Sequence, residues 1–167
     1  QVNTLKNGMV LDVFQVNNST GELISDTTKI KKIEDGITEV LTGKTKVAAL
    51  VGKRRPSILD KKAKPRVKTH VLIDNDVADV YTVVEIHAQN RIGLLYDITS
   101  TLTRLGVYIH IAKITTKGDE AADIFYIKDI FGQKISYDVR LKEISDGLYS
   151  AIEGAGGAED AGEKAGS

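Results

Sequence analysis

The distribution of apolar and polar residues predicts three strands and two helices in the second half of the chain. The stretches 81–88, 107–116 and 122–129 are rich in β-branched and aromatic residues, which favour strands. The segments after the first and the third stretch repeat apolar residues every three or four positions, as one face of a helix does. Gly106 is expected to end the first helix. The apolar positions of the two helices are Leu94, Leu95, Ile98, Leu102 and Leu105, and Leu141, Ile144, Leu148 and Ile152.

Part of this pattern occurs twice. When the chain is compared with itself at an offset of 111 residues, twelve of the forty positions from 4 to 43 are identical, including Gly21 with Gly132 and Ser25 with Ser136. Ser136 is expected to cap the helix that follows it. The chain is therefore predicted to contain one truncated copy of a structural unit, lacking its front half, followed by one nearly complete copy. The helix of the first copy is expected to present Ile30, Ile33, Ile37 and Leu41 on one face.

The order strand, helix, strand, strand, helix belongs to the ferredoxin-like βαββαβ plan, an α+β fold of antiparallel sheets with helices on one face. This plan places a fourth strand beside the first, but no strand-like segment follows Gly154. Residues 67–73 can take that place, because they can fold back antiparallel along 81–88 through a turn at 74–76. We expect this hairpin to occupy the vacant edge, since an unpaired edge strand promotes aggregation.

These patterns divide the chain into four segments. Residues 1–52 are the C-terminal half of a first domain, and residues 67–153 are a second domain. Residues 53–66 carry both prolines and a run of basic side chains, and are expected to be a linker. Residues 154–167 have no periodicity and no large apolar side chain, and are expected to form a disordered tail.

The composition limits the classes of function. Twenty-three basic and twenty-three acidic residues leave no net charge, so the charge balance favours neither nucleic acid nor a membrane as a partner. No cysteine is present, which excludes disulfides and thiolate chemistry and fits a cytoplasmic protein. No apolar run approaches the ~18 residues that span a bilayer. The start of the chain has no initiator methionine and no signal-peptide core, so we expect a piece of a longer protein.

The segment Asn90-Arg91-Ile92-Gly93 stands where the first helix of the complete copy begins. A helix N-terminus has unpaired amide donors and a partial positive charge, and a glycine lets a carboxylate approach the backbone without a Cβ in the way. Asn90 can hydrogen-bond the same ligand. Structural explanations stay open: Gly93 as a tight turn, Asn90 as a helix cap, and Arg91 as a solvated loop charge.

Two stretches of the second copy match the motifs of a known family. Residues 90–95 match an Asp-Arg-Pro-Gly-Leu-Leu motif, with Asn90 in place of the aspartate and Ile92 in place of the proline, and residues 123–127 match an Asp-Val-Phe-Tyr-Val strand. These motifs are typical of the ACT-domain family, which the chain resembles over about residues 7–152. The paired arrangement is most similar to the C-terminal ACT domains of the bifunctional PII uridylyltransferase/uridylyl-removing enzyme family.

The resemblance implies a regulatory pair of domains that senses an amino acid, with glutamine as the expected ligand, and controls distant catalytic domains in nitrogen regulation. The expected partners are that amino acid and the catalytic domains of a parent chain, with a second copy, bound through sheet edges or helices, as a further candidate. The predicted ligand-binding residues are Asn90, Arg91, Ile92, Gly93, Leu94 and Leu95 at the helix start, and Tyr108, His110 and Ile111 across a pocket between units.

Other chemistries fit the sequence less well. His70, His87 and His110 lack metal-ligand spacing, so no metal is predicted. The repeated Asp12 and Asp123 are interpreted as sharing a structural role rather than acid/base catalysis. No catalytic residue, cofactor or nucleic-acid partner is expected, because nucleotidyltransferase and phosphate-binding motifs are missing and the third strand lacks the basic-Gly-aromatic run of RNA-binding folds. The alternative function is a dimerisation or partner-docking module that binds no small molecule.

Overall fold

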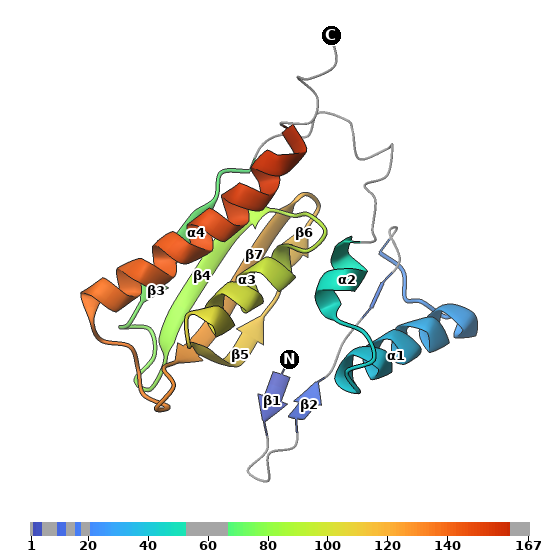
Figure 1. Cartoon of the computed structure of the whole chain (residues 1–167), viewed down its shortest axis with the longest axis horizontal. Helices are drawn as coiled ribbons and strands as arrows, with labels where there is room; N and C mark the ends of the chain where they lie inside the picture. Colours follow the sequence, from blue (N-terminus) through green and yellow to red (C-terminus); the bar gives the residue numbers. More distant parts are fainter. Residues whose placement is uncertain (1, 5–9, 13–15, 18–20, 53–66, 161–167) are drawn as a thin grey trace. The chain divides into compact units, whose positions relative to one another are not determined.

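The computed structural model describes residues 2–4, 10–12, 16–17, 21–52 and 67–160 (Figure 1). The chain divides into two compact units, of which the larger comprises Gln1–Leu11 with Lys62–Ser167 and the smaller Asp12–Lys61. The described residues 2–4 and 10–11 therefore group with the larger unit, whereas the sequence pattern assigned them to a first domain, 1–52. The predicted linker, 53–66, lies outside the described residues, so that boundary stays a prediction.

The larger unit is built on one antiparallel sheet with the strand order β3-β4-β7-β5, and the short strand β6 also pairs with β7. This order is that of the ferredoxin-like plan and confirms the predicted fold. The elements of this sheet and its helices are β3 (His70–Asp74), β4 (Thr82–Gln89), α3 (Leu94–Arg104), β5 (Tyr108–Lys113), β6 (Thr116–Lys117), β7 (Glu120–Lys128) and α4 (Asp138–Asp160).

The hairpin of β3 and β4 confirms the prediction that a preceding segment fills the edge beside the first strand of the complete copy. The two strands pair antiparallel from His70 opposite His87 to Asp74 opposite Val83. The connection is longer than the predicted turn and is held by the Asp74 carboxylate, which accepts hydrogen bonds from the amides of Asp76 at 2.6 Å and Val77 at 3.1 Å. Backbone pairing along the full length of β3 therefore removes that exposed edge of β4.

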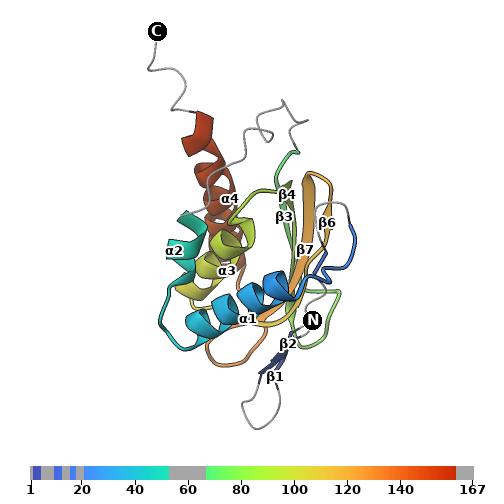
Figure 2. The same ribbon diagram turned by 90° about the vertical axis from the view of Figure 1, so that its right-hand side faces the viewer.

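Helices α3 and α4 lie on the same face of the sheet, as the side view shows (Figure 2). Their periodic apolar residues meet those of β4 and β7, and this face forms the hydrophobic core. The pattern placed most of these residues correctly, but Leu95 is 43% exposed because it lies on the flank of α3 that turns away from the sheet. Core residues with no exposed surface are Val84, Ile86, Ala88, Ile98, Leu102, Phe125, Ile127, Ile144 and Leu148.

The ends of α3 and α4 agree only in part with the sequence pattern. Gly106 follows the end of α3 in a left-handed conformation, φ 66°, as expected of a helix terminator. Ser136 is not the cap of α4, because that helix begins at Asp138. The helix also continues to Asp160, so the predicted tail that starts at Gly154 is wrong for residues 154–160. Ala155, Ala158 and Glu159 are good helix formers and favour this extension, whereas the three glycines of the stretch oppose it.

The smaller unit contains α1 (Thr27–Leu41) and α2 (Val47–Gly52). The N-cap of α1 is Asp26, whose carboxylate accepts hydrogen bonds from the amides of Thr28 at 2.9 Å and Lys29 at 3.3 Å, and not the repeated Ser25. The apolar face predicted for this helix is present, but its isoleucines are each more than one-third exposed. Two short strands, β1 (Val2–Thr4) and β2 (Val10–Asp12), belong to the larger unit except for Asp12, and form a separate two-stranded sheet.

Candidate functional site

The loop between β4 and α3 places Gly93 at the N-cap of α3 in a left-handed conformation, with φ 85° and ψ −6°. An L-residue is strained there, which confirms that a tight strand-to-helix turn needs this glycine. The same geometry shows that Asn90 is not the helix cap, because the cap lies three residues later and has no side-chain hydrogen bond. The first turn of α3 therefore begins without the side-chain acceptor that most helices have.

The main-chain amides around Gly93 divide into two groups. The Leu94 amide donates to the Arg91 carbonyl at 3.2 Å, and the Asp97 amide donates to the Gly93 carbonyl at 2.9 Å. The amides of Leu95 and Tyr96, between these two, have no acceptor among the residues that the structure describes. Two parallel donors at the positive end of a helix dipole suit a carboxylate.

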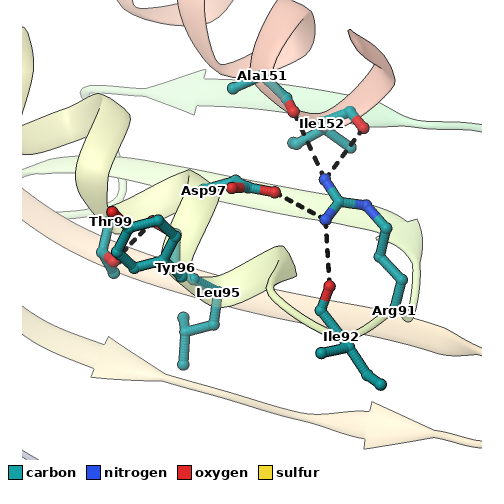
Figure 3. Close-up of polar contacts among 8 residues, drawn as sticks. All are labelled: Arg91, Ile92, Leu95, Tyr96, Asp97, Thr99, Ala151 and Ile152. Atoms are coloured by element: carbon teal, nitrogen blue, oxygen red, sulfur yellow. Dashed lines mark hydrogen bonds and ion pairs between the residues drawn. The ribbon is translucent and has the colours of Figure 1, made fainter. Parts of the chain in front are cut away.

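The Arg91 side chain points toward α4 and not into solvent (Figure 3). Its Nη1 forms an ion pair with Asp97 Oδ2 at 2.7 Å, and Nη1 and Nη2 contact main-chain carbonyls of Ile92, Ala151 and Ile152 at 3.4–3.5 Å. The side chain is only 17% exposed, so the alternative of a solvated loop charge is wrong. Sequence analysis missed Asp97 as its partner, although an acidic residue in the first turn of a helix is a common stabilising feature.

The other residues of the loop have different surroundings. The Asn90 amide donates to the Asp119 carbonyl at 2.8 Å, which ties the loop to the turn before β7, while the residue is exposed as a whole. Ile92 is 46% exposed, whereas Leu94 is buried in the core. Asn90, Ile92 and Leu95 thus form the accessible surface of the predicted site, and Leu94 anchors it.

Tyr108, His110 and Ile111 lie on β5, away from this loop. Tyr108 pairs with Lys128 at one end of β7, whereas Asn90 is held beside the opposite end of that strand. The His110 ring contacts the Tyr81 ring in a tilted arrangement, with ring centroids 5.6 Å apart. Burial, and then the charge of Lys128, lowers the pKa of His110. The larger unit does not bring the two sets of residues together. The predicted pocket between units stays a prediction.

Two hollows are present elsewhere in the described parts of the units. One of about 640 Å³ lies on the smaller unit, between the apolar sides of α1 and α2. The other, of about 430 Å³, lies between the β7–α4 connection and Gly106, and includes Lys134 and Arg140. Neither of these hollows borders Gly93.

Two further titratable groups have perturbed environments. His87 Nε2 lies 2.8 Å from Glu85 Oε1 and Nδ1 lies 3.4 Å from Glu120 Oε1, and these carboxylates raise the pKa of His87. Asp123 is buried, and burial raises the pKa of its carboxyl even though Oδ1 accepts the Thr115 amide at 3.1 Å. Asp123 therefore holds the end of β5 to β7, which agrees with the structural role predicted for it.

Among the residues that the structure describes, no group of three or more histidine or acidic side chains is arranged to hold a metal ion. The predicted absence of a cofactor is a separate matter and stays an expectation. None of the helices in the described ranges is long and apolar enough to cross a membrane.

Comparisons with known proteins find relatives of the part of the chain that contains this loop. A family model described as the ACR family N-terminal ACT domain matches residues 77–154. The bifunctional uridylyltransferase/uridylyl-removing enzyme of Azospirillum brasilense is 38% identical over 89% of the chain, and that of Rhodospirillum rubrum is 32% identical over 91%. The corresponding enzyme of Zymomonas mobilis is 35% identical over 93% of the chain. The chain spans only 16–17% of the length of these relatives. No solved structure matches it.

Proposed function

We propose a function for this chain from the premise that its residues 77–154 belong to the ACT-domain family and that most of its length is related to bifunctional uridylyltransferase/uridylyl-removing enzymes. It is the regulatory part of such an enzyme: it binds an amino acid, glutamine in the first place, and controls distant catalytic domains that modify the nitrogen regulator PII. The uridylyl chemistry itself belongs to those domains, and this part acts by favouring one of their arrangements when the ligand is bound.

The observation that carries this proposal is the pair of unpaired amides at the start of α3. Leu95 N and Tyr96 N have no acceptor within the described part of the chain, and the helix has no side-chain cap. The α-carboxylate of an amino acid supplies the missing acceptor and the negative charge that the helix end favours. Asn90, three residues before the N-cap of α3, is exposed and offers both a donor and an acceptor, which matches the side-chain amide of glutamine.

A ligand at this site controls distant domains only if its affinity differs between their two arrangements. The exposed apolar side chains at the site, Ile92 and Leu95, supply a reason for such a difference. In one arrangement a second surface covers them and completes the pocket, and in the other they face water. We assign three residues of β5 to that second surface, contributed by the larger unit of a second copy of the chain. They are Tyr108, His110 and Ile111.

Isothermal titration of the whole chain with L-glutamine tests the proposal, with L-glutamate and L-alanine as comparison ligands. Gly93→Val places a branched side chain where the carboxylate must approach, and Asn90→Ala removes the amide recognition, so each is expected to abolish or weaken glutamine binding. Arg104→Lys, on the far end of α3, is the matched control and is expected to bind as the parent chain does. Unchanged affinity in both loop variants would remove the loop from the site.

A docking module without a small-molecule ligand is the second candidate. The observation that favours it is that large apolar side chains are exposed on the larger unit, at Ile92 and Leu95 by the loop and, apart from them, at Tyr108 on β5. Thermal unfolding discriminates the two, because a ligand that binds only the folded state must raise the melting temperature. A melting temperature that is independent of glutamine but rises with protein concentration supports the docking module.

A further inference from the structure

The side chain of Arg91 is turned into the unit, although Arg91 stands in the middle of the ligand loop (Figure 3). We propose that Arg91 is a positioning residue, not a ligand contact: it couples the loop at 90–93 and the first turn of α3 to the C-terminal part of α4. The inference has two halves. The first, that Arg91 supports the end of α4 in the protein without ligand, is independent of the proposed function. The second, that a ligand acts on α4 through Arg91, rests on the proposed function.

The geometry requires an arginine. Nη1 is held by Asp97 at 2.7 Å, on α3, while Nη2 contacts the Ala151 and Ile152 carbonyls at 3.5 and 3.4 Å, on α4. A guanidinium reaches both helices at once because its donors form a rigid planar fork. A lysine ammonium donates from a single atom, so it spans the separation between Asp97 on α3 and the carbonyls on α4 less well than the two separate nitrogens of the guanidinium do.

The contact on α4 lies at the last buried side chain that the structure describes on that helix. This side chain is Ile152, and the helix itself continues to Asp160. The next turns contain Gly154, Gly156 and Gly157, and each glycine costs about 1 kcal/mol of helix stability relative to alanine. In an α-helix the carbonyls of residues 151 and 152 accept from the amides of residues 155 and 156, so the Arg91 contact holds the carbonyls on which the glycine-containing turns are built. The helicity of residues 153–160 therefore depends on the position of Arg91.

This dependence links the ligand loop to a marginal element. A ligand that binds the Leu95 and Tyr96 amides orders the same turn that carries Asp97, and through the ion pair it holds Arg91 against α4. Linkage is reciprocal, so whatever loosens Arg91 must also weaken ligand binding. The end of α4 is then the element whose equilibrium the ligand shifts.

Hydrogen–deuterium exchange of the whole chain without ligand tests the first half. In Arg91→Lys, the amides of residues 153–158 are expected to exchange severalfold faster, while the first turn of α3 changes less because lysine keeps the ion pair. Arg104→Lys, on the same helix, is the matched control and should leave both segments unchanged. If Arg91→Lys does not fold, Asp97→Asn removes the anchor of the guanidinium instead and is expected to release the same amides. Unchanged exchange at the end of α4 in the folded variants overturns the proposal.

Addition of L-glutamine tests the second half. In the parent chain, glutamine is expected to slow exchange at 153–158, and in Arg91→Lys this slowing is lost and affinity falls by about fivefold, within the range for residues that couple two sites. A parent chain that binds no glutamine refutes the proposed function and leaves the ligand-free result standing. Glutamine binding with equal slowing in the parent chain and in Arg91→Lys overturns the coupling alone. A residue needed only for overall stability would not give a selective change at α4.

Discussion

Gly93→Ala tests how the start of α3 is built. Gly93 has φ 85°, in the left-handed region, and an L-residue in that region costs about 1–2 kcal/mol. The free energy of unfolding of the larger unit is expected to fall by that amount. For a domain of about 60–100 residues, each kcal/mol shifts the melting temperature by about 4–8 °C, so Gly93→Ala should lower it by about 4–16 °C.

Two further substitutions separate backbone strain from a general effect of alanine. Gly154→Ala makes the same chemical change in α4, where φ is ordinary and the new Cβ meets open space, so it should stabilise by about 0.5–1 kcal/mol. Gly93→Asn should lie between the parent and Gly93→Ala, because asparagine tolerates the left-handed region.

The assay is urea unfolding followed by tyrosine fluorescence. All six tyrosines lie between residues 81 and 149, so this signal reports the larger unit and not the smaller one. The midpoint should change while the m-value stays constant. A Gly93→Ala variant as stable as the parent chain, or a loss of the same size in Gly154→Ala, would refute the left-handed turn as the reason for the glycine.

Three further predictions concern groups with perturbed surroundings. The pKa of His87 is raised by its glutamate neighbours, so the stabilisation from the protonated ring is complete below about pH 6.5 and is lost as the pH rises through the raised pKa. The urea midpoints of the parent chain and of His87→Asn should therefore converge at a pH above that pKa. Burial raises the pKa of Asp123, so the stability that this carboxyl contributes is lost as the pH rises above the ordinary pKa of an aspartate. Asp123→Asn keeps a carbonyl acceptor, so its stability relative to the parent chain should increase when the pH is raised from 3.5 to 7. An equal loss of stability at pH 3.5 and at pH 7 would contradict this. Thr82→Val leaves the buried Ile135 amide, now 3.0 Å from Thr82 Oγ1, without an acceptor and should cost about 1–3 kcal/mol in urea unfolding, against no such loss in the exposed control Thr103→Val.

The fold of the larger unit was largely predictable because local pattern and long-range packing agree there. Strands β4 and β7 are short β-branched and aromatic runs, and α3 carries one apolar face, so each element has a single way to bury its apolar side chains. The β3–β4 pairing followed from the same logic, since a sheet edge without a partner is unfavourable.

The sequence predicted where in the chain the candidate site lies, but not how its side chains are arranged. Glycine at a strand-to-helix junction indicated a left-handed turn, and Gly93 has that conformation. The direction of Arg91 was not predictable, because its partners come from two helices separated by many residues of sequence. Nor was the position of Tyr108 relative to the loop, which depends on the register of β5 on β7 and on its irregularity between Ile109 and Ile111.

By itself, the sequence determined the elements of the complete copy, their order and the faces that they bury, because the periods of strand and helix are local properties of the backbone. The tertiary structure alone decided which polar groups meet across those elements. It turned Arg91 inward to Asp97 and α4, left the Leu95 and Tyr96 amides without an acceptor in the described residues, and separated the loop from β5. Hydrogen bonds and ion pairs depend on distances of a few ångströms between residues far apart in the chain, and the order of residues alone does not specify such distances.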